Sequence, residues 1–101
     1  MTRPDLEYRF EWDPNKDLKN RMKHGVSFDE AQTAFDDPNA IYLEDVEHSI
    51  DEERFHLIGY SEKLRILFVC YCNRSSDIVR IISARKATKT ERDYYHQGGL
   101  Q

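Results

Sequence analysis

Three apolar stretches that follow one another closely in the second half of the chain constrain its fold most. They are residues 54–60, 64–72 and 78–84, and the links between them have only three and five residues. Because a parallel crossover needs about a dozen residues or more, such short links predict three consecutive antiparallel strands. The middle stretch is apolar at successive positions, which predicts a central strand covered by helices on one side.

Local signals place a first helix before these strands. Asp13 followed by Pro14 is typical of an N-cap with proline at the first helical position. Gly25 adopts the left-handed conformation that ends a helix without steric cost. We therefore expect a helix from Pro14 to about His24.

Two further helices are predicted by the same kind of signal. Ser27 and Glu30 fit the capping box, in which each side chain bonds the other residue's backbone N–H, and Pro38 closes this segment. Thr88 and Glu91 repeat the pattern and predict a last helix that ends at about Tyr95 or His96.

The complete order predicts an α+β domain. Alternating aromatic and charged residues at 8–12 indicate a half-buried strand, and residues 41–43 indicate a short one. The order is then β-α-α-(β)-β-β-β-α, with helices packed against an antiparallel sheet. A chain of 101 residues corresponds to one domain, over residues 1–101, with 1–6 and 97–101 predicted to be flexible.

The charge is distributed unevenly along the chain. The net charge of −4 argues against nucleic acid, since a basic domain is the usual signature of nucleic-acid binding. However, residues 27–53 hold ten acids and no base, whereas residues 54–101 hold nine bases and four acids. We therefore expect a nucleic-acid site in the second half and the acidic segment, including Glu44, Asp45 and Glu47, away from it, facing a basic partner.

The sequence also bears on the compartment of the protein and on whether it associates with a membrane. The longest apolar run has seven residues, far short of the roughly 20 that span a bilayer, so no membrane association is expected. The first residues lack the apolar stretch of a signal peptide, and Cys70 and Cys72 are too close to staple a fold. The sequence therefore predicts a cytoplasmic protein.

The end of the third predicted strand has the most unusual local composition in the chain. Strand periodicity puts Arg80 and Ser83 on opposite faces but Ser83 and Arg85 on one face, next to Lys86 and a helix N-terminus. Such a grouping of cations, a hydroxyl and free amides is suited to binding phosphate. The alternative is a solvated strand end whose cations pair with Asp or Glu.

Other residues add to this hypothesis. Arg54, Arg65 and Arg74 lie on or beside the preceding strands and predict a basic face of the sheet, and Tyr94 offers a surface for stacking a base. His24 carries an imidazole, a side chain that suits general acid–base work. A histidine at a helix C-terminus is equally explained by the helix dipole.

No metal or cofactor site is predicted. Cys70 and Cys72 share one strand face, but the sequence has no second cysteine pair or histidine pair at zinc spacing. The carboxylates between Glu44 and Glu53 fit no calcium-loop pattern and are more simply a solvated loop or a docking surface.

Taken in order, several short motifs resemble the BrnT toxin family over residues 9–95. The matching motifs are Phe10-Glu11-Trp12-Asp13-Pro14, Lys23-His24-Gly25-Val26-Ser27-Phe28, Glu53-Arg54-Phe55 with Ile58-Gly59, and Arg80-Ile81-Ile82-Ser83-Ala84-Arg85 followed by Glu91. The resemblance implies a RelE-like fold and a ribonuclease toxin of a bacterial type II toxin–antitoxin system. It also implies a cognate BrnA-type antitoxin that binds DNA, so that this chain meets DNA only through the antitoxin in a hetero-oligomer.

The implied reaction is metal-independent endonucleolytic cleavage of mRNA by attack of a ribose 2′-OH. With this resemblance, Arg80 and Arg85 are expected to clamp phosphate with Arg54 in support, and Lys23 or His24 to transfer a proton. Tyr94 is expected to stack on a base or act as an acid. The RNA-binding residues are expected to be Arg65, Arg74, Ser83 and Lys86.

Two other functions fit the same sequence. The chain is then either a non-catalytic protein-interaction module or a nucleic-acid binder that does not cleave. Binding without cleavage predicts an affinity that falls steeply with salt and gives no product.

Overall fold

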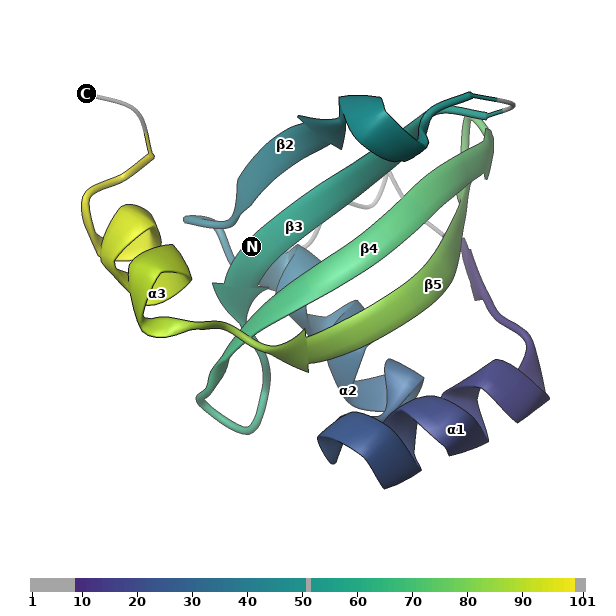
Figure 1. The fold of residues 1–101 in the computed structure, drawn as a ribbon, viewed down its shortest axis with the longest axis horizontal. Helices are drawn as coiled ribbons and strands as arrows, with labels where there is room; N and C mark the ends of the chain where they lie inside the picture. The colour runs from purple at the N-terminus through teal and green to yellow at the C-terminus, as the bar shows by residue number, and fades with distance from the viewer. Residues whose placement is uncertain (1–8, 51, 100–101) are drawn as a thin grey trace.

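The computed structural model describes residues 9–50 and 52–99. A five-stranded sheet with the order β1-β5-β4-β3-β2 forms the centre of the molecule (Figure 1). Its strands are β1 (Arg9–Glu11), β2 (Ile41–Asp45), β3 (Arg54–Tyr60), β4 (Ile66–Ser75) and β5 (Ile78–Lys86). The helices are α1 (Pro14–His24), α2 (Phe28–Thr33) and α3 (Lys89–His96), with short 3₁₀ turns at Ala34–Asp36 and Val46–His48.

The predicted α+β class is confirmed, and β2 to β5 pair in antiparallel fashion. The first strand differs from the expected all-antiparallel sheet, because β1 pairs parallel with β5, with Arg9 opposite Ile78. Its partner is far along the chain, and the short alternating segment carries no signal for the direction of pairing.

The bounds of the central hairpin also differ from the prediction. Leu64 does not begin β4; it lies in the preceding turn with φ 61°, where its N–H bonds the Ser61 carbonyl. At the other end, β4 continues to Ser75 and β5 starts at Ile78, so the predicted five-residue link is a two-residue hairpin turn. A tight turn of this kind is the common connection between antiparallel strands.

One face of the sheet packs against α1 and α2, which lie on the same side of it (Figure 1). The core on this side includes Val26, Phe28, Ala31, Ala34, Phe35, Leu57, Leu67, Val69, Tyr71, Val79, Ile81 and Ala84. The residues of this set on β4, namely Leu67, Val69 and Tyr71, alternate along the strand, as expected when one sheet face is buried.

The opposite face is covered at one end by α3. Tyr95 is buried there with Ile58, Ile66 and Ala87, and its hydroxyl donates a 2.6 Å hydrogen bond to Asp37. Thr88 and Glu91 form the complete capping box that the sequence predicts at the start of this helix. We call the whole face opposite α1 and α2 the open face.

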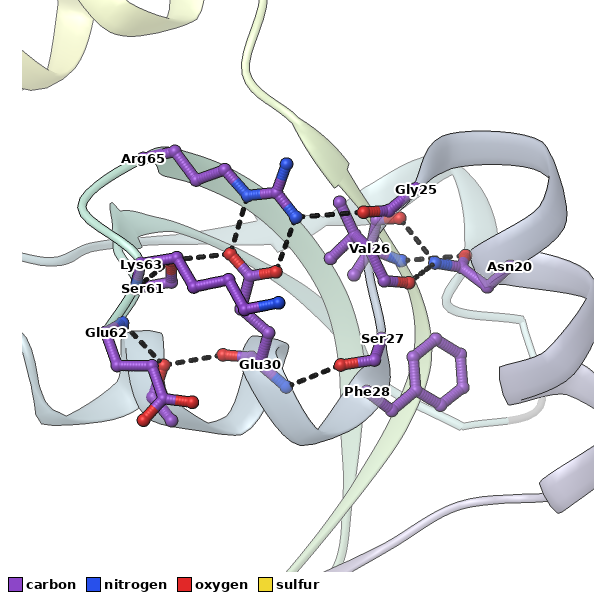
Figure 2. A network of polar contacts seen from close by, with 12 residues as sticks. Asn20, Gly25, Val26, Ser27, Phe28, Glu30, Ser61, Glu62, Lys63 and Arg65 are labelled. Carbon is purple, nitrogen blue, oxygen red and sulfur yellow. Dashed lines mark hydrogen bonds and ion pairs between the residues drawn. The ribbon is translucent and has the colours of Figure 1, made fainter.

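The predicted capping box of α2 is only half formed, and Figure 2 shows the reason. Ser27 accepts from the Glu30 N–H, but the Glu30 carboxylate does not return this bond. It instead accepts two hydrogen bonds from Arg65, at 2.6 and 2.7 Å, and one from Ser61 at 2.6 Å. Glu30 is 1% exposed, and a buried carboxylate needs charge compensation that a backbone N–H alone does not give. The bonds from Arg65 hold the pKa of Glu30 below its usual value despite burial.

Asn20 joins α1 to the free edge of β5. Its side-chain amide donates to the carbonyls of Val26 and Ala84, and its oxygen accepts from the Ala84 N–H. The buried Asn20 side chain therefore takes the place of a neighbouring strand at Ala84, beyond the short pairing with β1.

The predicted ends of the domain are partly described. Residues 1–6 and 100–101 lie outside the described residues. At Gly98 and Gly99, by contrast, the N–H groups bond the carbonyls of Tyr95 and Tyr94 and close the end of α3. No helix in the described part of the chain is long and apolar enough to span a membrane.

Candidate functional site

Side chains from neighbouring strands form three rows across the open face. The rows follow from the strand register, since directly paired residues point to the same side of a sheet. The first row is Ile41, Ile58, Phe68 and Arg85; the second is Leu43, His56, Cys70 and Ser83; the third is Asp45, Arg54, Cys72, Arg80 and Glu11. The apolar first row lies under α3, and the other two rows carry the ionisable groups.

A bulge in β5 brings more of the predicted residues to this face than strand periodicity allows. Cys70 pairs with Ser83 but Tyr71 pairs with Ile81, so Ile82 is an extra residue without a partner. Beyond it the alternation of β5 is reversed. The prediction that Arg80 and Ser83 lie on opposite faces is therefore wrong, because the unforeseen bulge turns both toward the open face.

A cavity of about 330 Å³ opens over these rows. It is lined by His24, Asp45, His48, Arg54, His56, Phe68, Cys70, Ile82, Ser83, Ala84 and Arg85. His24 ends α1, one helical turn after Asn20, so the Asn20–Ala84 hydrogen bonds fix it beside β5. Four of the predicted site residues, namely His24, Arg54, Ser83 and Arg85, are thus brought together.

Arg54 is the cation in this cavity for which the described residues provide no carboxylate counterion. Within the described part of the chain its guanidinium forms no ion pair with a carboxylate, and its Nε is buried without a hydrogen-bond partner. A buried guanidinium N–H costs free energy unless it is bonded. An anionic ligand that enters the cavity would give the Arg54 guanidinium the counterion that the described residues do not provide.

Arg85 is held more firmly by its neighbours. It forms a two-point ion pair with Glu91, at 2.8 and 2.9 Å, and its guanidinium lies 4.3 Å from the centre of the Phe68 ring. The pairing with an acid is the alternative that the sequence left open for this strand end. The bonds from Glu91 raise the pKa of Arg85, so it stays cationic at the cavity wall.

Sequence reasoning missed the acid–base group formed by Asp45, His48 and His56. The Asp45 Oδ2 atom lies 3.1 Å from His56 Nε2 and 3.0 Å from His48 Nδ1. Burial tends to raise the pKa of Asp45, but the hydrogen bond from His48 and the two nearby imidazoles outweigh it and lower that pKa. Period-2 alternation does place His56 on the same face as Arg54, which was the available signal.

Asp45 also corrects the expectation for the acidic segment. The sequence predicts that this segment lies away from the basic site, yet Asp45 is 7% exposed and lines the same cavity as Arg54. The reason is β2, which pairs with β3 so that Asp45 is directly opposite Arg54.

Other predicted residues lie near the cavity without lining it. Arg80 and Arg74 both contact the Glu11 carboxylate, at 2.9 and 3.4 Å, at the β1 side of the open face. Tyr94 packs at the other side, against the apolar cluster beneath α3 that includes Phe68.

Three predicted residues are placed elsewhere. Lys23 is exposed on α1 and is not among the residues that line the cavity. Arg65 lies on the helix-covered side in the ion pair with Glu30, and one of its Nη atoms also bonds the Gly25 carbonyl (Figure 2). Lys86 pairs with Leu67, which belongs to the helix-covered core, so it alternates away from Arg85.

These observations define a small α+β domain whose cavity is lined by arginines, three imidazoles and a buried thiol. A sequence profile for the family described as "Ribonuclease toxin, BrnT, of type II toxin-antitoxin system" matches residues 12–91. This chain belongs to that family, which confirms the predicted resemblance, and membership implies an antitoxin partner.

Solved structures support the fold. The crystal structure of the Brucella abortus ribonuclease toxin BrnT aligns with a TM-score of 0.64 and 24% sequence identity. The alignment covers 81% of this chain and 99% of that chain. A search of curated protein sequences gives no significant match.

Proposed function

We propose that this ribonuclease toxin cleaves RNA endonucleolytically at the open-face cavity, by a metal-independent attack of a ribose 2′-OH on the adjacent phosphorus. The observation that carries the proposal is the Arg54 guanidinium, which faces a cavity lined by three imidazoles and has an unbonded, buried Nε. A phosphodiester supplies the missing anion, and its bridging and ribose oxygens supply the groups on which the imidazoles act.

Arg54 and Arg85 stabilise the charge that grows on the phosphoryl oxygens in the transition state. Such electrostatic stabilisation is usually the largest contribution to catalysis, and removing one donor costs about 10²–10³ in rate. Arg54 donates hydrogen bonds to the phosphate directly, because it has no carboxylate partner in the described residues. Arg85 is held in place by Glu91 and contributes a fixed positive charge at the edge of the cavity. The Ser83 hydroxyl, exposed in the row between them, adds a neutral donor to the phosphate.

Two of the imidazoles, those of His56 and His24, carry out the proton transfers. His56 takes the proton from the 2′-OH, and Asp45 stabilises the imidazolium that forms, 3.1 Å away. The ribose oxygen then bonds phosphorus, the bond from phosphorus to the 5′-oxygen breaks, and His24 gives that oxygen a proton. The products are a 2′,3′-cyclic phosphate and a 5′-hydroxyl.

The remaining sequence candidates have smaller parts in this proposal. Arg80 and Arg74 extend the third row toward β1 and contact neighbouring phosphates of a bound strand in competition with Glu11. Tyr94 packs against the apolar cluster beneath α3 and offers a base a stacking surface at the opposite side. Lys23, Arg65 and Lys86 have no part in it, because they lie outside the open face and its cavity.

The partner and the compartment follow from the family rather than from the cavity. We infer that the antitoxin is of the BrnA type, that it supplies the DNA-binding domain of the complex, and that the pair acts in the cytoplasm. The neighbouring reading frame tests this at once. A short adjacent frame that encodes a DNA-binding protein, and that relieves growth arrest when it is co-expressed, is expected.

The reaction itself is tested with purified protein and RNA in EDTA, with and without ribosomes. Cleavage that leaves 2′,3′-cyclic phosphate ends, and that fails at a site carrying a single 2′-deoxy substitution, is expected. RNA that stays intact under all these conditions would contradict the proposal. It would leave the non-catalytic interaction module as the better description of this chain.

A further inference from the structure

Three metal-binding donors from three neighbouring strands converge in the cavity. An oxygen of Asp45, a ring nitrogen of His56 and the sulfur of Cys70 all lie within 4.8 Å of one another. His56 and Cys70 are direct cross-strand partners on β3 and β4, and Asp45 lies one row along on β2. Paired strands hold such side chains more rigidly than a loop would.

The spacing of these donors is close to that of a tetrahedral zinc site. Zinc bonds of about 2.0–2.3 Å and tetrahedral angles put neighbouring donors about 3.3–3.8 Å apart. The distance between Asp45 Oδ2 and His56 Nε2 is 3.1 Å. Small side-chain rotations therefore suffice to bring all three donors to a shared ion without a change in the sheet.

The chemistry of the donors selects zinc over other common divalent ions. A thiolate, an imidazole and a carboxylate form a mixed set that zinc accepts, whereas magnesium and calcium take oxygen donors. The two anionic donors also balance the charge of the ion. Because the Cys70 thiol releases its proton when it binds zinc, the loaded site is neutral, and the net charge beside the guanidinium of Arg54 rises by one unit rather than by two.

A neighbouring histidine orients the carboxylate. His48 Nδ1 lies 3.1 and 3.0 Å from the two oxygens of Asp45 and is itself outside the group of three donors. Hydrogen bonds of this kind orient metal ligands and raise metal affinity. With three protein donors, the fourth tetrahedral position faces the cavity and is open to water.

We propose that Asp45, His56 and Cys70 form a zinc-binding site on the open face and that bound zinc inhibits RNA cleavage. The second half rests on the proposed function, because a zinc ion held by Asp45 and His56 engages the carboxylate and the imidazole that the proposed reaction uses to take the proton from the 2′-OH. The sequence alone predicts no metal site here, since the donors are far apart in the chain and only the strand register brings them together.

Cobalt(II) substitution tests the site without using activity. Co²⁺ bound to a thiolate gives a near-ultraviolet charge-transfer band, and Zn²⁺ added in competition should remove it. Cys70→Ser should lose this band and bind zinc more weakly by more than the roughly 10–100-fold that an outer-shell change costs. The matched control is Cys72→Ser, since Cys72 is also buried and two residues further along β4 but lies outside the donor group.

The zinc site is contradicted by a wild-type protein that shows no thiolate–cobalt band, or by a band that survives Cys70→Ser. Circular dichroism and a thermal melt without metal exclude misfolding of either variant as the cause. Zinc should also raise the melting temperature of the wild type and of Cys72→Ser but not that of Cys70→Ser.

Inhibition is then measured by titrating zinc into the RNA cleavage assay. Cleavage by the wild type and by Cys72→Ser should fall with zinc occupancy, and cleavage by Cys70→Ser should not respond at the same zinc concentrations. Cleavage that stays unchanged at full cobalt or zinc occupancy contradicts the inhibition. If RNA stays intact even in EDTA, the proposed function fails while the cobalt spectrum still reports on the site.

Discussion

Arg65 and Arg54, which lie on opposite faces of the sheet, differ in how their guanidinium groups are paired. On the helix-covered face, Arg65 is fully paired, with two hydrogen bonds to the buried Glu30 and one to the Gly25 carbonyl. On the open face, Arg54 has no carboxylate partner among the described residues and holds a buried Nε without a hydrogen bond. The same strand alternation thus serves folding on one side and leaves charge available for a ligand on the other.

The largest expected effect is on the stability of the paired face. Arg65→Met leaves the Glu30 carboxylate buried and unpaired, which should cost about 3–5 kcal/mol of unfolding free energy. Urea denaturation measures it. The double variant Glu30→Leu/Arg65→Met removes both charges and should recover most of the loss; a double variant as unstable as the single one would show that packing, rather than the unpaired charge, is responsible.

The next effect is on the activity of the open face. Arg54→Gln should lower the rate of RNA cleavage about 10²–10³-fold, or about 2.7–4 kcal/mol of transition-state stabilisation. Its stability should hardly change, because the described structure shows no bond to lose at Nε. The control is Arg21→Gln, an exposed arginine of α1 that does not line the cavity and should cleave at the wild-type rate.

Asn20 joins α1 to β5 and so bears on both the stability of the fold and the position of His24 at the cavity. Asn20→Ala leaves buried backbone groups at Ala84 and Val26 without partners and should cost about 2–3 kcal/mol. Because His24 is one turn further along, cleavage per folded molecule should also fall. Asn15→Ala, an exposed asparagine of the same helix, is the control, and an equal loss of stability in both variants would argue against the role of the Ala84 bonds.

A smaller effect is expected where α3 packs. Tyr95→Phe removes the 2.6 Å hydrogen bond to Asp37 and should cost about 1–2 kcal/mol at neutral pH. Burial raises the pKa of Asp37, but the bonds from Tyr95 and two backbone N–H groups outweigh it and lower that pKa below 3.8. This stabilisation is present above pH 3.8 and is lost as the pH falls through the lowered value. The variant should therefore lose less stability on acidification, and parallel pH profiles for the two proteins would contradict this.

Sequence signals predicted the features that depend on neighbours in the chain. Asp13, Gly25 and Thr88 cap their helices as expected, because a cap is formed by residues within one turn. Glu30 shows the limit of such signals: its local role as a capping residue is replaced by an ion pair with a distant arginine.

The parts of the site that were missed depend on strand register. The bulge at Ile82 reverses the face of Ser83, and the position of Asp45 opposite Arg54 needs the pairing of β2 with β3. Neither is encoded in local periodicity, since a shift of one residue moves every following side chain to the other face. The sequence predicted that Ser83 and Arg85 share one face at the end of the strand. It did not predict that His48 and His56 lie beside Asp45.

The most direct test of the account measures both faces in one experiment. Unfolding free energy and RNA cleavage per folded molecule are determined together for Arg54→Gln and Arg65→Gln. The account predicts that Arg54→Gln keeps its stability and loses its cleavage rate, and that Arg65→Gln loses stability and keeps its rate. An Arg54→Gln protein that cleaves at the wild-type rate, or an equal loss of rate in both variants, would contradict it.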